Sequence, residues 1–169
     1  MTAAFPGASQ VPHEAWMGLA LHQAREALLT DDVPVGAVVL SPQGHVIGTG
    51  LNLRVGGSDP LGHAEMLAIR AAAANLGHYR LDGCLLVVTL EPCLMCAGAA
   101  MQSRLSGIVF GAYDKKAGAC GSAWDVIADN PSPHKVTCVG GVREQECATL
   151  LTEFFRARRR RRSGESRVE

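Results

Sequence analysis

The sequence predicts an α/β protein, a three-layer α/β/α sandwich in which a central mixed five-stranded sheet lies between two layers of helices. Short apolar, β-branched segments alternate with segments whose apolar residues recur every three or four positions. The first two apolar segments are joined by a turn containing Pro and Gly, which predicts that the sheet begins with an antiparallel hairpin. The length of 169 residues fits one domain, and a hydrophobic content of 47% is enough to build its core.

The predicted elements run from an amphipathic helix at the start of the chain to a second amphipathic helix at its end. Pro12 suits the first turn of the first helix, and Cys84–Leu90 is apolar almost throughout, as in strands buried on both faces. The predicted helices are 12–30, 63–76, 92–103 and 144–160. The predicted strands are 33–40, 45–51, 84–90, 107–113 and 135–140, with loops at 53–62 and 115–133.

Charge is distributed unevenly along the chain. The formal net charge is zero, but residues 154–169 contain seven Arg and two Glu, and five of these arginines are consecutive. We predict an N-terminal extension at 1–11, a folded domain at 12–157 and a basic arginine-rich tail at 158–169. One basic end on a neutral or acidic body favours local contact with phosphates there, and a solvated end is the alternative.

Nothing in the composition indicates secretion or a membrane span. The start of the chain lacks the basic and apolar parts of a signal peptide, and no segment approaches about 18 uninterrupted apolar residues. We therefore expect a cytoplasmic protein with no membrane partner. Its six cysteines are then expected to be reduced, so that their spacing indicates metal binding, redox chemistry or packing.

Two short motifs open the second and third predicted helices. His-Ala-Glu occupies 63–65 and Pro-Cys-Leu-Met-Cys occupies 92–96. Cysteines three apart project from the same side of a helical turn, so Cys93 and Cys96 can bind one ion. His63 would add the third protein ligand of a catalytic zinc site, whose fourth position stays open for water. We predict one Zn²⁺ per subunit.

Glu65 is the predicted catalytic residue. It lies about 200° from His63 on an ideal helix, so we expect His63 at the helix entrance and Glu65 beside the ion as a proton carrier. A thiol redox pair is the competing interpretation, but it assigns no role to His63 or Glu65. The other cysteines lack paired spacing and are interpreted as packing or surface thiols. They are Cys84, Cys120, Cys138 and Cys147.

Together the two motifs resemble those of the zinc-dependent cytidine and nucleobase deaminases. Over about 12–160 the chain is more specifically similar to the bacterial tRNA adenosine deaminases. The matching segments are 34–38, Asn52, 89–91, 96–99, 109–112, Asp114 and 154–156. The resemblance implies a cytidine deaminase-like fold, a zinc-dependent deaminase domain at 12–157 and no organic cofactor. It also implies a homodimer that converts the wobble adenosine of a tRNA anticodon stem-loop to inosine and releases ammonia.

The resemblance further implies contacts with the substrate. It places Asn52 against the target base and Asp114 near the ribose; a turn-forming Asn and a loop cap are the alternative interpretations. Phe155, Arg156 and Arg159 are the RNA contacts expected at the basic end. Glu91 stays outside the predicted catalytic set, because a carboxylate beside a helix start is favourable in any case.

The chain departs from the family pattern at Leu51, at Leu61-Gly62 and in its heavier arginine run. The arginine run leaves the path of the RNA stem open. Two alternative functions remain. A deaminase of free cytosine, cytidine or guanine would share the fold, zinc and Glu65 but would not need a basic end. A noncatalytic zinc-binding or redox module would not need Glu65.

Overall fold

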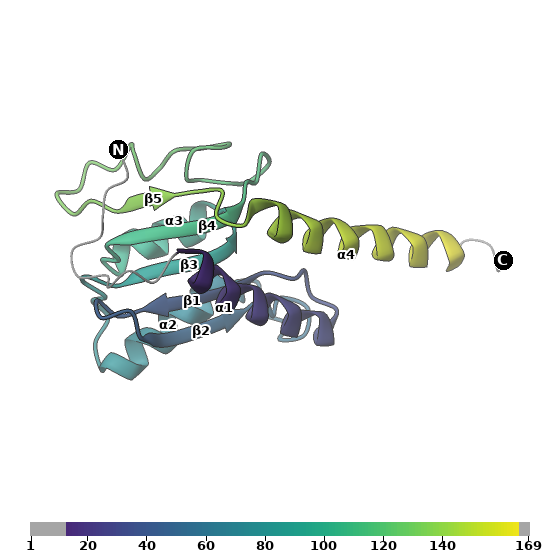
Figure 1. Cartoon of the computed structure of the whole chain (residues 1–169), viewed down its shortest axis with the longest axis horizontal. Helices are drawn as coiled ribbons and strands as arrows, with labels where there is room; N and C mark the ends of the chain where they lie inside the picture. The colour runs from purple at the N-terminus through teal and green to yellow at the C-terminus, as the bar shows by residue number, and fades with distance from the viewer. Residues whose placement is uncertain (1–12, 166–169) are drawn as a thin grey trace.

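The structure is a computed structural model that describes residues 13–165, and it confirms the predicted three-layer sandwich (Figure 1). The helices are α1 (His13–Glu26), α2 (Ala64–Leu76), α3 (Leu94–Gln102) and α4 (Glu144–Glu165), and a 3-10 turn, η1 (Ala27–Thr30), follows α1. The strands are β1 (Gly36–Leu40), β2 (Val46–Leu51), β3 (Leu85–Leu90), β4 (Gly107–Ala112) and β5 (Thr137–Val139).

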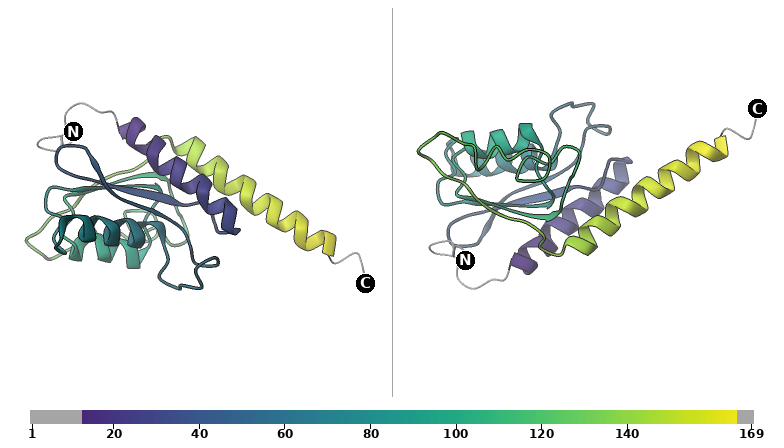
Figure 2. Two further views of the ribbon diagram at one scale, coloured as in Figure 1. Left: turned by 90° about the horizontal axis from the view of Figure 1, so that it is seen from below. Right: turned by 90° about the horizontal axis from the view of Figure 1, so that it is seen from above.

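The sheet is mixed and has the strand order β2-β1-β3-β4-β5. Strand β1 is antiparallel to both β2 and β3, so the predicted hairpin is confirmed, whereas β3, β4 and β5 are mutually parallel. Helices α1 and α4 lie side by side on one face, and α2 and α3 cover the other (Figure 2). Strands β1 and β4 are buried along their whole length because both of their faces are covered.

Each face of the sheet has its own apolar core. Leu86, Val88 and Ile108 point toward α2 and α3, whereas Val87 and Val109 alternate to the opposite face and pack against α1 and α4. Burying one such side chain contributes about 1.5–3 kcal/mol. The two cores fix the sheet between the helices, and thereby fix where α2 and α3 begin.

Glycine and alanine bring α2 unusually close to β2. A Cβ atom on Gly50 would collide with the backbone of Ala64 and Ala68, so only glycine is accommodated there. The facing row of α2 consists of small side chains, Ala64, Ala68 and Ala72, all fully buried. The first turn of α2 is therefore seated directly on the sheet.

Three element boundaries differ from the prediction by three residues or more. Residues 33–35 precede β1, because Val35 N bonds to Val33 O in a tight turn and Val33 O accepts the side chain of Asn52. The first helix ends at Glu26, and 27–30 wind as a 3-10 turn closed by the left-handed Asp31. Helix α4 continues past 160 to Glu165.

The arginine run is helical. Residues 158–165 of the predicted tail continue α4 without a break at 158, because Arg has high helix propensity and cations are favoured near a helix C-terminus. The predicted extension at 1–11 and residues 166–169 lie outside the described residues. Between 13 and 165, no helix combines the length and the apolarity that crossing a bilayer requires.

Candidate active site

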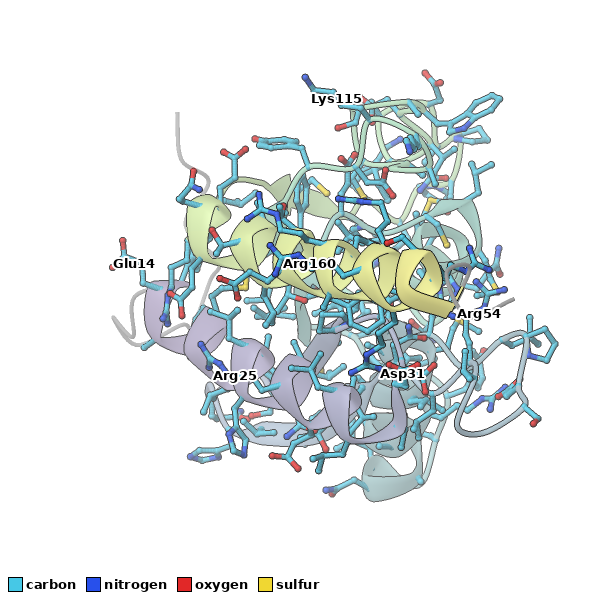
Figure 3. All side chains as sticks on the ribbon, turned by 90° about the vertical axis from the view of Figure 1, so that its right-hand side faces the viewer. Glu14, Arg25, Asp31, Arg54, Lys115 and Arg160 are labelled. Atoms are coloured by element: carbon cyan, nitrogen blue, oxygen red, sulfur yellow. The ribbon has the colours of Figure 1, made fainter. Side chains whose placement is uncertain are left out.

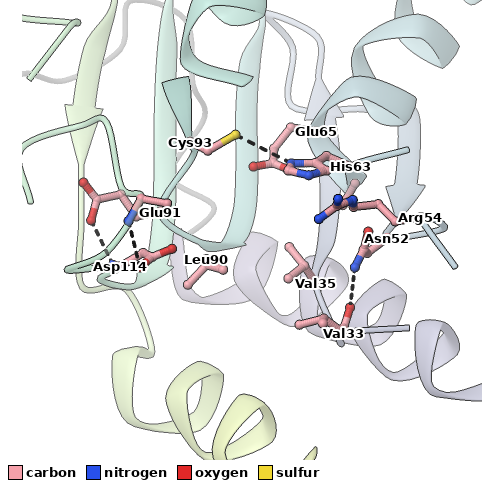
Figure 4. Close-up of a pocket in the computed structure, with 12 residues that line it drawn as sticks. Val33, Val35, Asn52, Arg54, His63, Glu65, Leu90, Glu91, Cys93 and Asp114 are labelled. Carbon is pink, nitrogen blue, oxygen red and sulfur yellow. Dashed lines mark hydrogen bonds between the residues drawn. The ribbon is translucent and has the colours of Figure 1, made fainter. Parts of the chain in front are cut away.

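The starts of α2 and α3 and the end of β3 surround a pocket of about 190 Å³ (Figure 4). The predicted residues His63, Glu65, Cys93, Asn52 and Asp114 all line it. The remaining lining residues are Val33, Val35, Arg54, Ala64, Leu90, Glu91 and Ala117. Residues from five separate stretches of sequence therefore meet in one cavity.

His63 and Cys93 occupy equivalent positions at the ends of their helices. Each is the N-cap residue, with an extended backbone (ψ 147° and 174°), and each accepts the first helical hydrogen bond, from Leu67 N and Ala97 N respectively. An N-cap side chain lies outside the helical spiral. This geometry confirms the expectation that His63 sits at the helix entrance, and it lets Glu65 enter the same pocket from the first turn.

His63, Cys93 and Cys96 form a cluster with the geometry of a zinc site. Their ligand atoms all lie within 4.8 Å of one another, with His63 Nδ1 3.6 Å from Cys93 Sγ and 3.5 Å from Cys96 Sγ. Tetrahedral zinc with its usual Zn–S and Zn–N bond lengths requires S···N separations of about 3.6 Å. Two thiols and one imidazole at these distances fit Zn²⁺.

One thiol of the cluster is held as a thiolate by its neighbours. Hydrogen bonds from Cys96 and His63 lower the pKa of Cys93 to about 3, so that this residue is a thiolate. The hydrogen bonds to Cys93 raise the pKa values of His63 and Cys96, so these two residues release protons when a metal ion binds. Zinc ligands must be deprotonated, and a thiolate at neutral pH is ready to bind.

Glu65 is a buried carboxyl beside this cluster. It is 4% exposed, and burial raises its pKa to about 7 because the charged form loses its hydration. A carboxyl that takes up and releases protons near neutral pH is suited to general acid–base catalysis.

Asn52 presents an unsatisfied oxygen to the pocket. Its side chain is 7% exposed, and Nδ2 donates to Val33 O at 3.1 Å. Oδ1 is fully buried and has no hydrogen-bond partner within the described part of the chain. Such an acceptor is costly unless a ligand donates to it.

Glu91 organises the loop that forms one wall of the pocket. Its carboxylate, in a residue 2% exposed, accepts hydrogen bonds from the backbone N–H groups of Asp114, Cys120 and Ser122, each at 3.0 Å, and from the hydroxyl of Ser122. Asp114 Oδ1 caps the loop by accepting from Lys116 N and Ala117 N. Glu91 is thus a positioning residue whose extent of bonding was not predicted from the sequence.

The predicted RNA contacts on α4 are only partly brought together. Phe155 and Arg159 line a hollow with Lys116 and Thr152, while Arg156 is exposed outside that lining. A second hollow, which adjoins the catalytic pocket through Asn52 and Arg54, also includes Arg158.

Helix α4 therefore presents arginines to two hollows, of which the one with Arg158 adjoins the catalytic pocket. Lys115 lies on one side of α4 and Asp31 on the other (Figure 3). Arg161 forms an ion pair with Asp31 at 3.3 Å, and the Arg158 guanidinium stacks over Phe154. The ion pair joins the arginine run to the turn after α1, whereas the contact with Phe154 lies within α4.

Arg54 is a pocket residue that sequence reasoning missed. It follows Asn52 in the loop 53–62, lines the catalytic pocket and the neighbouring hollow, and points toward the pocket in Figure 4. An arginine in a loop has no periodic pattern by which its direction can be predicted. Only the turn of 53–62, held by hydrogen bonds from Val55 N and Gly56 N to buried Asp32, directs it there.

Comparison with known proteins identifies the family. Residues 10–112 match the cytidine and deoxycytidylate deaminase zinc-binding region, a range that contains His63, Glu65, Cys93 and Cys96. The chain belongs to the cytidine and deoxycytidylate deaminase family. It therefore carries a zinc-binding deaminase domain, as the two sequence motifs indicated.

Relatives of this deaminase fall into two groups by length. The chain is 51% identical over 146 residues to a tRNA(Ile)-lysidine synthase of Deinococcus deserti, covering 86% of this chain but 27% of that protein. It thus spans about a quarter of that relative. It is 44% identical to the tRNA-specific adenosine deaminase of Haemophilus influenzae, covering 86% of this chain and 84% of that protein.

Solved structures of deaminases share the fold. A structure from a study of A-to-I editing by tRNA:A34 deaminases has a TM-score of 0.76 at 40% identity, covering 81% of this chain and 99% of that chain. A guanine deaminase from Nitrosomonas europaea has a TM-score of 0.74 at 29% identity, covering 83% of each chain. The cytidine deaminase-like fold is therefore confirmed.

Proposed function

We propose that this deaminase converts the wobble adenosine of a tRNA anticodon to inosine by hydrolysis, with release of ammonia. The main supporting observation is that Glu65 lines the same pocket as His63 and Cys93. The ligand atom of buried Cys96 lies within 4.8 Å of those of His63 and Cys93. The choice of adenosine in tRNA is supported by the tRNA-specific adenosine deaminase relative and by the A34 deaminase structure.

His63, Cys93 and Cys96 would hold the zinc ion. Their separations match a tetrahedral donor set, and three protein ligands leave one position for water, as in catalytic zinc sites. When bound, the ion would act as a Lewis acid that lowers the pKa of a water molecule toward about 7.

Glu65 would move the protons of the reaction. Its carboxylate accepts a proton from the attacking water and delivers it to adenine N1, which makes C6 electrophilic. After the water oxygen adds to C6, Glu65 takes the remaining proton from the new C6 hydroxyl and passes it to the amino group. The C6–N bond then breaks, ammonia leaves and a C6=O bond forms. Burial supports this role because the carboxyl pKa of about 7 permits both directions of transfer at neutral pH.

Asn52 and Asp114 would bind the target nucleoside. Oδ1 of Asn52 is a buried acceptor without a partner in the described chain, which suits an N–H group of a base in the pocket. Asp114 lines the same pocket and is assigned to the ribose, in addition to its role as a loop cap.

The RNA backbone would follow the rims of the pocket. Phe155, Arg156 and Arg159 are assigned to the anticodon stem-loop, and Arg158 faces the hollow beside the pocket. Each phosphate that an arginine neutralises releases counterions and strengthens binding at low salt. Because a single extruded base enters the zinc pocket, no long stacking platform is needed.

We also infer that the protein acts as a homodimer in the cytoplasm. Val55, Leu61 and Leu94, each within two residues of a residue that lines the pocket, are all more than 40% exposed. Exposed apolar side chains that lie together are typical of protein interfaces. Sedimentation velocity of the zinc-loaded protein tests this proposal, and a monomer at micromolar concentration would contradict it.

Guanine deamination is the second candidate, because the Nitrosomonas europaea guanine deaminase has nearly the same fold. The deciding experiment incubates purified protein in parallel with transcribed tRNA, adenosine, cytidine and guanine, and assays inosine, uridine and xanthine. We expect inosine in the tRNA reaction alone. Xanthine from guanine, with unmodified tRNA, would replace the proposal by guanine deamination. Inosine from free adenosine or uridine from cytidine, with unmodified tRNA, would contradict both.

A further inference from the structure

Cys120 and Cys138 meet on one face of the sheet, outside the zinc-type cluster. In the parallel register of β4 and β5, Cys138 lies opposite Ile108. Ile108 belongs to the core beneath α2 and α3, as does Val136, two residues before Cys138. Residues paired in register point to the same side of a sheet. Cys138 therefore faces the side on which Cys120 packs.

The two thiols are in direct contact and are unequally exposed. A hydrogen bond joins the side chains of Cys120 and Cys138 and, together with burial, raises the pKa of Cys120. Cys138 is exposed on the short strand β5, whereas Cys120 is half-buried. Cys138 is thus accessible to a small oxidant, and Cys120 is a protected neighbouring thiol.

We propose that Cys120 and Cys138 form a reversible intramolecular disulfide when the protein meets a hydroperoxide. The Cys138 thiolate attacks one peroxide oxygen; an S–O bond forms, the O–O bond breaks and, for hydrogen peroxide, hydroxide leaves and is protonated to water. Cys120 sulfur then attacks Cys138 sulfur. The S–S bond forms, the S–O bond breaks, and a second water leaves, so that two thiols lose two electrons to one peroxide.

The disulfide would brace the wall of the catalytic pocket. Cys120 N is bonded to Glu91, and Gly118, two residues earlier, pairs with Cys93 through an isolated β-bridge. A covalent bond from Cys120 to β5 would join this loop to the edge of the sheet. The link leaves His63, Cys93 and Cys96 untouched, so the oxidised protein keeps its zinc site.

Peptide mapping tests the proposal in the zinc-loaded full chain. Trypsin cleavage after Lys116, Lys135 and Arg143 separates the two cysteines onto peptides 117–135 and 136–143, while Cys93 and Cys96 stay on peptide 81–104. After treatment with hydrogen peroxide and alkylation of the remaining thiols, we expect 117–135 linked to 136–143. The link should disappear with dithiothreitol, and the zinc content per chain should be unchanged.

Variants and stability provide the second readout. Oxidation should raise the melting temperature of the wild-type protein, and neither Cys138→Ser nor Cys120→Ser should show the link or the rise. Cys147→Ala, which removes a buried thiol elsewhere, should retain both. Separate overoxidation of the two cysteines, or a link between two chains on a non-reducing gel, would overturn the proposal. These outcomes do not depend on which substrate the enzyme deaminates.

Discussion

The Nδ1 atom of His63 lies 3.6 Å from the Sγ atom of Cys93, although thirty residues separate them in the sequence. The contact exists because each residue is the N-cap of a helix on the same face of the sheet. The chain between them runs along α2 and returns through β3. Two helix starts, held by one sheet, thus assemble the zinc-type cluster.

Replacement of Glu65 by Gln should remove proton transfer and leave the metal site intact. General acid–base catalysis contributes about 10²–10⁴-fold, so we expect at least a loss of that size in kcat for tRNA deamination. Zinc content, measured by mass spectrometry of the same sample, should remain that of the wild-type protein. Unchanged turnover would eliminate the proposed mechanism.

Replacement of His63 by Ala should weaken zinc binding. Even the loss of a hydrogen bond that supports a metal ligand costs about 10–100-fold in affinity, so removal of a ligand should cost more. Competition with a chromophoric chelator measures the affinity, and Cys84→Ala, a buried thiol remote from the cluster, is the matched control. Equal affinities for the two variants would show that the cluster is not the zinc site.

Asn52→Ala should impair substrate use more than metal binding. The substitution removes Oδ1, an acceptor that has no partner in the described chain. It also removes the hydrogen bond from Nδ2 to Val33 O. Leaving a buried partner group unpaired costs about 1–3 kcal/mol, which corresponds to roughly a 5–150-fold lower kcat/KM on tRNA. Steady-state kinetics at matched zinc content tests this, and a kcat/KM within twofold of wild type would contradict the assignment to the base.

Glu91→Ala should destabilise the fold. The substitution leaves the backbone N–H groups of Asp114, Cys120 and Ser122 without their acceptor. Each buried, unpaired donor costs about 1–3 kcal/mol. We expect a loss of about 2–4 kcal/mol in the free energy of unfolding by urea, since water can satisfy part of the loop. Glu26→Ala, at an exposed residue, should change it by less than about 0.5 kcal/mol. Similar values for both variants would refute the positioning role.

Truncation after Phe155 should weaken tRNA binding more at low salt than at high salt. Each lost phosphate contact reduces the slope of log K against log salt by about 0.7–0.9. Fluorescence anisotropy across a salt series measures the slope, and Arg159→Ala should lower it by one such step. Arg70→Ala, an exposed arginine on α2, should leave it unchanged. If the truncation leaves tRNA affinity and its salt slope unchanged, the arginines form a solvated helix end that does not bind tRNA.

The elements that the sequence predicted best are those with long, regular patterns. The buried strand β3 and the helices α2 and α3 begin and end within two residues of the predicted bounds, because burial on both faces and N-terminal caps leave distinct residue patterns. The stretch 33–35 was assigned to a strand because its valines favour one. In the structure, Val33 O instead accepts a hydrogen bond from the side chain of Asn52, and β1 begins only at Gly36.

The cluster of His63, Cys93 and Cys96 and the position of Glu65 were predictable, since their spacing at two helix starts restricts where the side chains can point. The partners of Glu91 were not, because they come from a loop with no periodic pattern. The contact between Cys120 and Cys138 could not be predicted from their spacing in the sequence either, because it depends on the register of β5 against β4.

The amino-acid sequence by itself determined the fold class, the family and the donor atoms available for a metal ion, because these depend on local patterns and on residue types. Only the tertiary structure decided which hollow Arg158 and Arg159 each line, that the side-chain oxygen of Asn52 has no partner within the described residues, and which two thiols touch. These relationships join segments far apart in the chain, and the packing of the helices onto the sheet sets their distances.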